Sequence, residues 1–360
     1  DYITTWEAYQ PRTKSTPYFV MADDKYVFSM TFGKYIEVPE TYAIIQNGTI
    51  EATDAEVNEE NIYDFLLDKN GGVIKERCGY NGYDIYVFEV SEGKLMYKGE
   101  TVDKEAVLKI VSGFKTGIIQ KNVTQGEFED AFFPDSVNTV RVISMMKKDE
   151  TFHEIVAAVQ RIGTKRSAPV DNFSQGGGSA PVNIETGEIG SMSCIDSFDE
   201  NGNRIYFDKH PDTDAQIKGK TIPNWEKIKE EIVNVTQKLP YFPMIAWDIA
   251  IKDDGIVVIE VNMKSSLNIF QIHSGMNMAT SRSKIMKNLT WKNVMGQRNA
   301  IFGFAAIWIV FYHIYNSYYF FYVPVITQVL RIGNMGVDIF VFLSAIGLSF
   351  SMEKNTTGEF

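Results

Sequence analysis

The sequence contains little cysteine and no excess of positive charge. Its two cysteines, Cys78 and Cys194, lie far apart and match no metal-binding spacing, which favours a reducing compartment. The net charge of −11 argues against a nucleic-acid-binding protein, because such proteins usually present a basic stripe. Neither an internal repeat nor a signal-peptide pattern is evident. Because Asp1 replaces an initiator methionine, we expect that the N-terminus has been cut.

The composition otherwise is that of a globular protein, with 44% hydrophobic and 22% charged residues. A chain of 360 residues exceeds the usual size of a single core, which favours two units. The composition changes near residue 298, since no charged residue appears between Arg298 and Arg331. We therefore predict one domain over residues 1–295 and an incomplete second unit over residues 296–360.

Two apolar runs in the second unit are candidate membrane spans. Asn299–Val323 is long enough to cross about 30 Å of hydrocarbon, whereas the charge-free run Ile339–Met352 is short for a span. A buried core helix is the alternative for either run. The segment from Arg282 to Arg298 contains basic residues and no acid, which favours the cytoplasmic side of the membrane for the preceding domain.

Strand-like and helix-like patterns mix within residues 1–295. Five segments have the pattern of strands, namely residues 71–77, 83–90, 137–146, 152–163 and 255–262. Two have the apolar spacing of helices, namely residues 58–69 and 224–239. This order is neither a β-α-β alternation nor strands alone, so we predict an α+β fold. Residues 171–183 are rich in glycine and are predicted to form a loop within the domain.

The most informative segment is residues 244–262, where two apolar runs flank Asp253-Asp254-Gly255. Asp-Gly supplies the positive φ of a type I′ turn, so a hairpin is predicted. Folding this hairpin places Asp248 beside Glu260 and Asn262, which share one face because they lie two residues apart on a strand. Two carboxylates and an amide oxygen suit Mg²⁺, which prefers oxygen ligands and phosphate. The alternative is a solvated polar face without a metal.

This hairpin resembles the metal-binding end of ATP-grasp enzymes, whose signature is an Asp on one strand and Glu-x-Asn on the next. The segments FFPDSVNTVRVIS, DNFSQGGG, HPDT and IAWDIAI resemble the sugar-transfer-associated ATP-grasp family, and the resemblance covers roughly residues 15–290. It implies an ATP-grasp fold, ATP and Mg²⁺ as cofactors, and a ligase that activates a carboxylate as an acyl phosphate.

Several residues are expected to bind the nucleotide. Lys75 ends a predicted strand and precedes a loop with Gly79 and Gly82, where a lysine meets phosphate oxygens and glycines allow close approach of the backbone. Lone lysines and glycines are otherwise structural or solvated. The resemblance adds an earlier family lysine and the hinge that holds adenine, namely Lys25, Gln120, Lys121 and Asn122.

Other residues are expected to contact the reacting groups. The resemblance implies that Arg141 steadies the transferred phosphoryl group or the acyl phosphate and that Asn138 helps hold the same loop. An ordinary salt bridge is the alternative for Arg141. A substrate or phosphate loop is predicted to contain Asp171, Asn172 and the glycines Gly176, Gly177 and Gly178. His210, which precedes a proline, is either a substrate contact or a turn residue.

The C-terminal part resembles the opening of acyltransferase family 3 membrane proteins. Arg298 and His313 have the spacing of that family's first helix, and His313 matches the position that activates an acyl-acceptor hydroxyl. Only the first two spans of that family are present, so the acyltransferase domain is expected to be incomplete.

These observations together predict a carboxylate ligase that uses ATP and Mg²⁺. Its substrates are expected to be an amino acid or sugar acid and a sugar or glycan acceptor of a cell-surface polymer. The ligase domain is expected to be cytoplasmic, anchored to the membrane and coupled to an O-acyltransferase. The alternative is a membrane acyltransferase whose cytoplasmic domain binds nucleotide or glycan without catalysis.

Overall fold

The computed structural model describes residues 18–53, 55–79, 84–146, 152–263, 265 and 267–273. Contacts divide the chain into two units, Asp1–Asn277 and Met278–Phe360, and every described residue belongs to the first. Both predicted membrane spans lie outside the described residues, as do Gly82 and His313. Among the residues that the structure describes, no helix is long and apolar enough to cross a membrane.

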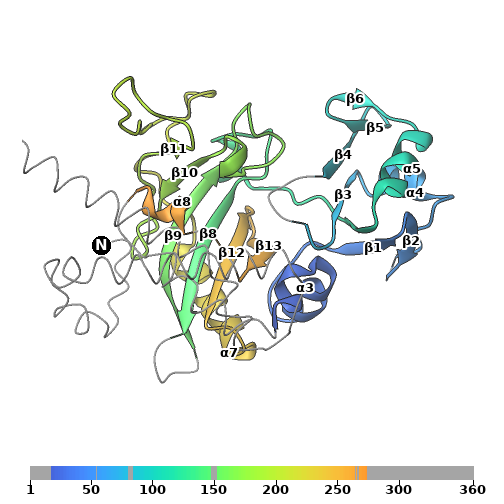
Figure 1. The fold of residues 1–360 in the computed structure, drawn as a ribbon, viewed down its shortest axis with the longest axis horizontal. Coiled ribbons are helices and arrows are strands. Elements are labelled where there is room, and N and C mark those ends of the chain that lie inside the picture. Colours follow the sequence, from blue (N-terminus) through green and yellow to red (C-terminus); the bar gives the residue numbers. More distant parts are fainter. Residues whose placement is uncertain are drawn as a thin grey trace, which may run out of the picture. The chain divides into compact units, whose positions relative to one another are not determined.

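The described unit contains two antiparallel sheets, each with its own hydrophobic core (Figure 1). Seven strands form the first sheet in the order β2-β1-β7-β3-β4-β5-β6. They are β1 (Thr41–Gln46), β2 (Thr49–Ala52), β3 (Gly72–Glu76), β4 (Ile85–Ser91), β5 (Lys94–Tyr97), β6 (Glu100–Thr101) and β7 (Thr116–Gln120). Two helices, α4 (Ile62–Asp68) and α5 (Lys104–Gly113), pack on this sheet through residues spaced four apart, namely Ile62, Leu66, Val107 and Val111.

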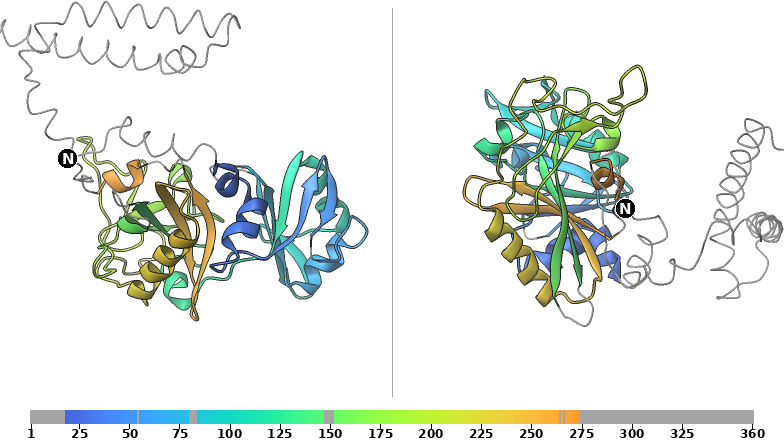
Figure 2. Two further views of the ribbon diagram at one scale, coloured as in Figure 1. Left: turned by 90° about the horizontal axis from the view of Figure 1, so that it is seen from below. Right: turned by 90° about the vertical axis from the view of Figure 1, so that its left-hand side faces the viewer.

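Six strands form the second sheet in the order β11-β10-β9-β8-β12-β13. They are β8 (Thr139–Met146), β9 (His153–Ile162), β10 (Gly178–Pro181), β11 (Ser193–Cys194), β12 (Met244–Ile251) and β13 (Ile256–Asn262). Helix α7 (Trp225–Lys238) covers one face of this sheet (Figure 2). Because side chains alternate along a strand, Trp247 and Ile249 enter this core while Asp248 lies on the opposite face.

Short helices link the sheets. Helices α2 (Val20–Asp23) and α3 (Lys25–Phe32) pack on the second core, where the rings of Phe32 and Trp247 lie 5.8 Å apart. Asp24 caps α3 by accepting the backbone N–H of Tyr26 at 3.0 Å. The remaining short helices are α6 (Glu127–Asp130), the 3-10 turn η2 (Phe173–Gln175) and α8 (Asn268–Gln271).

The predicted hairpin is confirmed in its pairing but wrong in its turn. Asp248 pairs with Glu260 and Ala246 with Asn262, as the sequence predicted. Residues 252–255 link the strands, and the Lys252 N–H donates to the Gly255 carbonyl at 2.9 Å. Neither Asp254 nor Gly255 has a positive φ, because a four-residue loop does not require the left-handed turn of a two-residue loop.

The tip and the outer edge of this hairpin are anchored. Asp253 Oδ1 accepts the backbone N–H of Glu127 at 2.8 Å, at the start of α6. The Val258 N–H donates to the Glu37 carbonyl at 2.9 Å, and Lys252 Nζ pairs with the Glu37 carboxylate at 2.9 Å. The two strands are therefore held at the tip as well as along the sheet.

All five predicted strands and both predicted helices are present, which confirms the α+β class. The loop predicted over residues 171–183 is wrong in its second half, because Gly178–Pro181 forms β10 and pairs with β9. Gly178 leaves room for Met192, whose Cε would lie 2.4 Å from a Cβ at this position. The glycine therefore serves close packing within a strand rather than a loop.

Candidate active site

A cavity of about 1190 Å³ is lined by residues of both sheets and of the loops beside them. Most of the predicted site residues line it, although they come from distant parts of the chain. They are Lys25, Lys75, Gly79, Gln120, Lys121, Asn122, Arg141, Asp171, Asn172, Asp248, Glu260 and Asn262.

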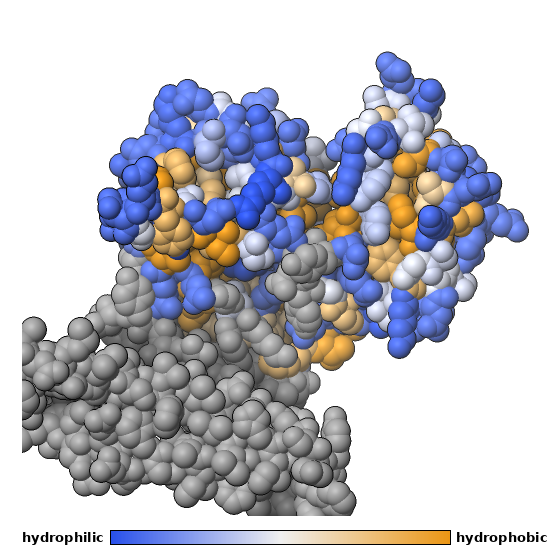
Figure 3. Space-filling view, turned by 45° about the horizontal axis from the view of Figure 1, so that its top comes forward, coloured by the Kyte–Doolittle hydropathy of each residue, from blue (hydrophilic) through white to orange (hydrophobic). Residues whose placement is uncertain are grey.

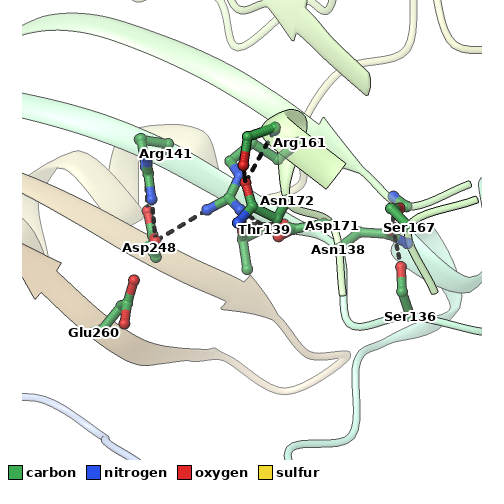
Figure 4. Close-up of polar contacts among 12 residues, drawn as sticks. Ser136, Asn138, Thr139, Arg141, Arg161, Ser167, Asp171, Asn172, Asp248 and Glu260 are labelled. Carbon is green, nitrogen blue, oxygen red and sulfur yellow. Dashed lines mark hydrogen bonds and ion pairs between the residues drawn. The ribbon is translucent and has the colours of Figure 1, made fainter. Parts of the chain in front are cut away.

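A row of charged side chains crosses three strands at the floor of this cavity. Arg141, Asp248 and Glu260 lie opposite one another on β8, β12 and β13 (Figure 4). Arg141 donates from Nε to Asp248 Oδ1 at 2.6 Å and from Nη2 to Oδ2 at 2.5 Å, and Arg161 donates from Nη1 to Oδ2 at 3.0 Å. Burial disfavours the charged carboxylate, but the two guanidinium groups outweigh burial and lower the pKa of Asp248 to about 2.

Arg161 is a site residue that the sequence analysis missed. It is buried near the end of β9 and also pairs with Asp171, with 2.6 Å between Nη2 and Oδ1. Thr139 donates its hydroxyl to the other oxygen of Asp171 at 2.5 Å. Burial raises the pKa of Asp171, and the charge of Arg161 opposes that rise. The available signal was a cation near the end of a strand whose middle, residues 155–159, is apolar.

The oxygen atoms on β12 and β13 fit a magnesium ion. Glu260 and Asn262 share one face, where Asn262 Nδ2 donates to Glu260 Oε1 at 3.1 Å. Asp248 already accepts three hydrogen bonds from arginines, so Glu260 and Asn262 are better placed to offer oxygen ligands. Within the described ranges there is no group of three His, Cys, Asp or Glu residues that could hold a metal. The set of Asp248, Glu260 and Asn262 has two carboxylates and an amide.

Two lysines line the same cavity as these oxygens. Lys75 is buried at the end of β3, and Lys25 Nζ donates to the Gly79 carbonyl at 2.9 Å. Burial lowers the pKa of Lys75 to about 8; the charge of Lys25 also lowers it, and the charge of Glu260 raises it. These three side chains thus act on one another electrostatically, which is the arrangement needed to receive a polyphosphate with its metal ion.

The end of β7 supplies two buried acceptors to the cavity. Gln120 donates to Thr41 Oγ1 at 3.1 Å and Asn122 donates to the Phe88 carbonyl at 2.6 Å. In the part of the chain that the structure describes, Gln120 Oε1 and Asn122 Oδ1 have no hydrogen-bond partner. Buried acceptors are normally paired, so these two oxygens are suited to a ligand that donates hydrogen bonds. Lys121 between them is exposed at its side chain, and its backbone N–H donates to the Glu40 carbonyl.

The sequence matches the family model described as sugar-transfer associated ATP-grasp over residues 5–287. The chain belongs to this ATP-grasp family. The search of curated proteins finds no match.

Solved ATP-grasp structures resemble the chain at low sequence identity. One is the ATP-grasp ligase PsnB with minimal precursor, Mg and ADP, at 13% identity and a TM-score of 0.35, covering 70% of this chain and 53% of that one. A RimK domain ATP-grasp protein from Sphaerobacter thermophilus has 12% identity and a TM-score of 0.36, covering 71% and 64%. A D-alanine–D-alanine ligase from Bacillus anthracis has 13% identity and a TM-score of 0.33, covering 68% and 57%. The chain thus spans less than two thirds of each.

Asn138 and His210 are predicted site residues of this ATP-grasp chain that do not line the cavity. Asn138 is fully buried, donates from Nδ2 to the carbonyls of Glu129 and Phe133 at 3.0 and 2.9 Å, and accepts the Gly163 N–H at 2.8 Å. His210 Nε2 lies 2.8 Å from the Gly163 carbonyl, and burial lowers the pKa of His210. Both side chains therefore hold Gly163 in place, and neither reaches the ligand space.

The predicted substrate loop is only partly a cavity wall. Asp171 and Asn172 line the cavity, whereas Gly176 and Gly177 do not. Gly176 ends η2 with a φ of 105°, and a Cβ on Gly177 would lie 2.4 Å from the Asp171 carbonyl oxygen. These two glycines permit the tight turn that presents Asp171, so their contribution to the ATP-grasp site is indirect.

Proposed function

We propose that this chain is an ATP- and Mg²⁺-dependent ligase that activates a carboxylate by phosphorylation. The observation that carries the proposal is that Lys25, Lys75, Glu260 and Asn262 line one cavity, where the charges of Lys25 and Glu260 both act on buried Lys75. Two cations next to an oxygen-ligand pair suit a nucleoside triphosphate and its metal ion. ATP and Mg²⁺ are the cofactors expected of an ATP-grasp ligase, and family membership supports both.

The reaction has two steps. The bond between the β,γ-bridging oxygen and the γ-phosphorus of ATP breaks as a carboxylate oxygen bonds to that phosphorus, which leaves ADP and an acyl phosphate. An amine or hydroxyl then attacks the acyl carbon, loses its proton and displaces inorganic phosphate. Glu260 and Asn262, with Asp248 beside them, would hold Mg²⁺. The bound ion would neutralise part of the negative charge on the phosphates.

Arg141 is suited to hold the transferring group. Its Nε and Nη2 are fixed on Asp248, and the described residues offer no partner for its Nη1 group. A guanidinium that is already oriented loses little freedom when its remaining donors meet a phosphoryl oxygen. Lys75 and Lys25 would meet the other phosphate oxygens, and the acceptors of Gln120 and Asn122 would meet the amino group of adenine.

The substrate class and the location extend this proposal. A sugar-transfer associated family favours an amino acid or sugar acid as the carboxylate and a sugar or glycan as the acceptor. The resemblance of residues 296–360 to the opening of an acyltransferase 3 domain favours a cytoplasmic ligase anchored to the membrane and coupled to O-acylation. Those residues lie outside the described ranges.

Glu260→Gln tests the ligase proposal. ADP release is measured with a panel of amino acids and uronic acids, and the variant is expected to lose at least about 100-fold in turnover. The substitution removes the one carboxylate of the proposed metal site that is not paired with arginines, and Mg²⁺ needs that negative charge. Asp254→Asn, at an exposed carboxylate of the same hairpin, is the matched control and should retain turnover. Unchanged turnover in Glu260→Gln would contradict the metal assignment. Nucleotide binding without ADP release from any acid would favour a binding domain.

A further inference from the structure

One end of the cavity is formed by residues that follow β11 and by helix α8. Ile195, Arg204, Asn268, Ile269 and Ile272 line it. Tyr206 joins the two parts, because its hydroxyl donates to the Ile272 carbonyl at 2.6 Å. This part of the lining therefore combines three isoleucines with a single guanidinium group.

Arg204 is held in place without an acidic partner. Its Nη1 donates to the Cys194 carbonyl at 2.8 Å and to Ser193 Oγ at 3.3 Å, and its Cζ lies 4.5 Å from the centre of the Phe198 ring. Across the described residues no carboxylate pairs with Arg204, whereas the other two arginines of the cavity, Arg141 and Arg161, are both paired with Asp248. Arg204 is thus the arginine of this cavity whose charge the described residues leave unbalanced.

The groups around Arg204 leave this charge uncompensated. Burial, and then the charge of Arg204, lower the pKa of His273 to about 4, so this imidazole is neutral at pH 7. Ser179 is the hydrogen-bond partner of His273 Nε2, at 2.8 Å. A half-buried cation between apolar walls is screened less than a cation in water, so its field attracts an anion to this end of the cavity.

The wall that carries Arg204 is tied to the rest of the site. Arg166 and Asp196 form an ion pair that joins the residues after β11 to the segment before η2. Arg166 also packs on Gly176, where a Cβ would lie 2.6 Å from Arg166 Cδ. A subsite whose wall is already fixed loses little entropy when a ligand binds.

We propose that this end of the cavity binds a substrate of the ligase other than the nucleotide. This substrate carries an anionic group next to an apolar portion. The inference rests on the proposed function, which places the nucleotide at the lysines. The planar guanidinium of Arg204 matches the oxygens of a carboxylate or a phosphate, and Ile195, Ile269 and Ile272 cover the apolar portion.

The surface outside the cavity agrees with an apolar portion. Ile195, Phe198, Ile205 and Tyr206, all on the same segment, are exposed. On the described surface, apolar side chains occur as patches among hydrophilic ones (Figure 3). A substrate with an apolar part longer than the cavity end would find further apolar contacts on this segment.

Calorimetry on the full chain, loaded with AMPPNP and Mg²⁺, tests the inference. Hexyl β-glucuronide is expected to bind at least about 10-fold more tightly than hexyl β-glucoside, since a hydrogen bond to a charged group contributes that much. It should also bind more tightly than methyl β-glucuronide. Comparison of hexanoate with hexyl phosphate then distinguishes a carboxylate subsite from a phosphate subsite.

Two variants make the test specific. Arg204→Gln should reduce the affinity for hexyl β-glucuronide to that for hexyl β-glucoside and leave the affinity for AMPPNP unchanged. Lys218→Gln removes an exposed cation that does not line the cavity, and should keep the preference for the anion. Equal affinities for the two hexyl sugars in the unmodified chain, or an intact preference in Arg204→Gln, would overturn the inference. An intact anion preference without ADP release would instead refute the ligase proposal alone.

Discussion

Arg161 and Asp248 form a buried ion pair, with 3.0 Å between Nη1 and Oδ2, although β8 lies between their strands β9 and β12. Arg161 also binds Asp171, so one guanidinium joins the end of the substrate loop to a strand of the proposed metal site (Figure 4). The two carboxylates would repel each other without this cation.

We expect Arg161→Met to destabilise the protein by about 3–5 kcal/mol, because the substitution leaves two buried carboxylates without their shared cation. Urea unfolding gives the free energy. Arg166→Met removes an ion pair in which both side chains are more than half exposed, and should cost about 0–1 kcal/mol. Equal losses in the two variants would mean that the buried pair has no special weight.

Lys75 should make nucleotide affinity depend on pH. Its pKa is lowered to about 8 in the folded protein, so burial of the charged form costs stability below pH 8, and this cost disappears as the pH rises toward the usual value of 10.5. Phosphate binds the charged form. ATP affinity should therefore fall above about pH 8, by up to about tenfold per pH unit.

Two lysine variants are compared with the unmodified protein by calorimetry between about pH 7 and about pH 10. This range extends about two pH units above the lowered pKa of Lys75. Lys75→Arg keeps its charge throughout, so the fall should vanish. Lys121→Arg changes an exposed lysine of the same cavity and should leave the fall intact. Parallel curves for all three proteins would place Lys75 away from the phosphates.

Glu129 should lower stability at neutral pH. It is fully buried, with Gln160 Nε2 at 2.8 Å, and burial, with added repulsion from Asp171 and Asp130, raises its pKa from 4.5 to about 8. In the unfolded chain the Glu129 carboxyl ionises above pH 4.5, whereas in the folded chain it stays protonated up to about pH 8. The stability that the protonated carboxyl contributes is therefore complete below pH 4.5 and is lost by about pH 8. Glu129→Gln does not titrate, so relative to the unmodified protein it should gain at least about 1 kcal/mol between pH 4 and pH 8.

Urea unfolding of this variant at several pH values measures the gain. Glu127→Gln, at an exposed carboxylate of the same helix α6, is the control and should differ from the unmodified protein by a constant amount. A constant difference for Glu129→Gln as well would mean that Glu129 is ionised in the folded protein.

Two glycine substitutions separate a required glycine from a tolerant one. Gly177→Ala should cost about 1–3 kcal/mol, because its Cβ would lie 2.4 Å from the backbone oxygen of Asp171. Gly255→Ala meets nothing within 4 Å and has no positive φ, so its unfolding free energy should stay within about 0.5 kcal/mol. A large loss of unfolding free energy in Gly255→Ala would instead support the left-handed turn that the sequence predicted.

The sequence predicted those features that local patterns determine. Two apolar runs on either side of Asp253-Asp254-Gly255 were sufficient to pair Asp248 with Glu260. The same patterns do not reveal which partner a polar side chain meets across the sheet, so Arg161 was missed and the structural contacts of Asn138 were not foreseen.

The loop prediction for the second half of residues 171–183 was wrong for a related reason. Glycine usually marks a turn, but at Gly178 the decisive contact is Met192, which follows it by fourteen residues and is not adjacent in any local pattern. His210 was left open between a turn residue and a substrate contact, and its bond to the Gly163 carbonyl gives it a structural contact. Residues 274–360, with the predicted membrane spans, lie outside the described part, so those predictions stay as they were made.

The anchored hairpin has a consequence for local opening of the sheet. Asp253 fixes its tip on α6, and the segment at Glu37 fixes the outer edge of β13, which is the last strand of the second sheet. To fray, β13 must break these contacts as well as its pairing with β12, so it should open less readily than a free edge strand. Glu260 and Asn262 lie on this strand, so their backbone positions are held before any ion binds.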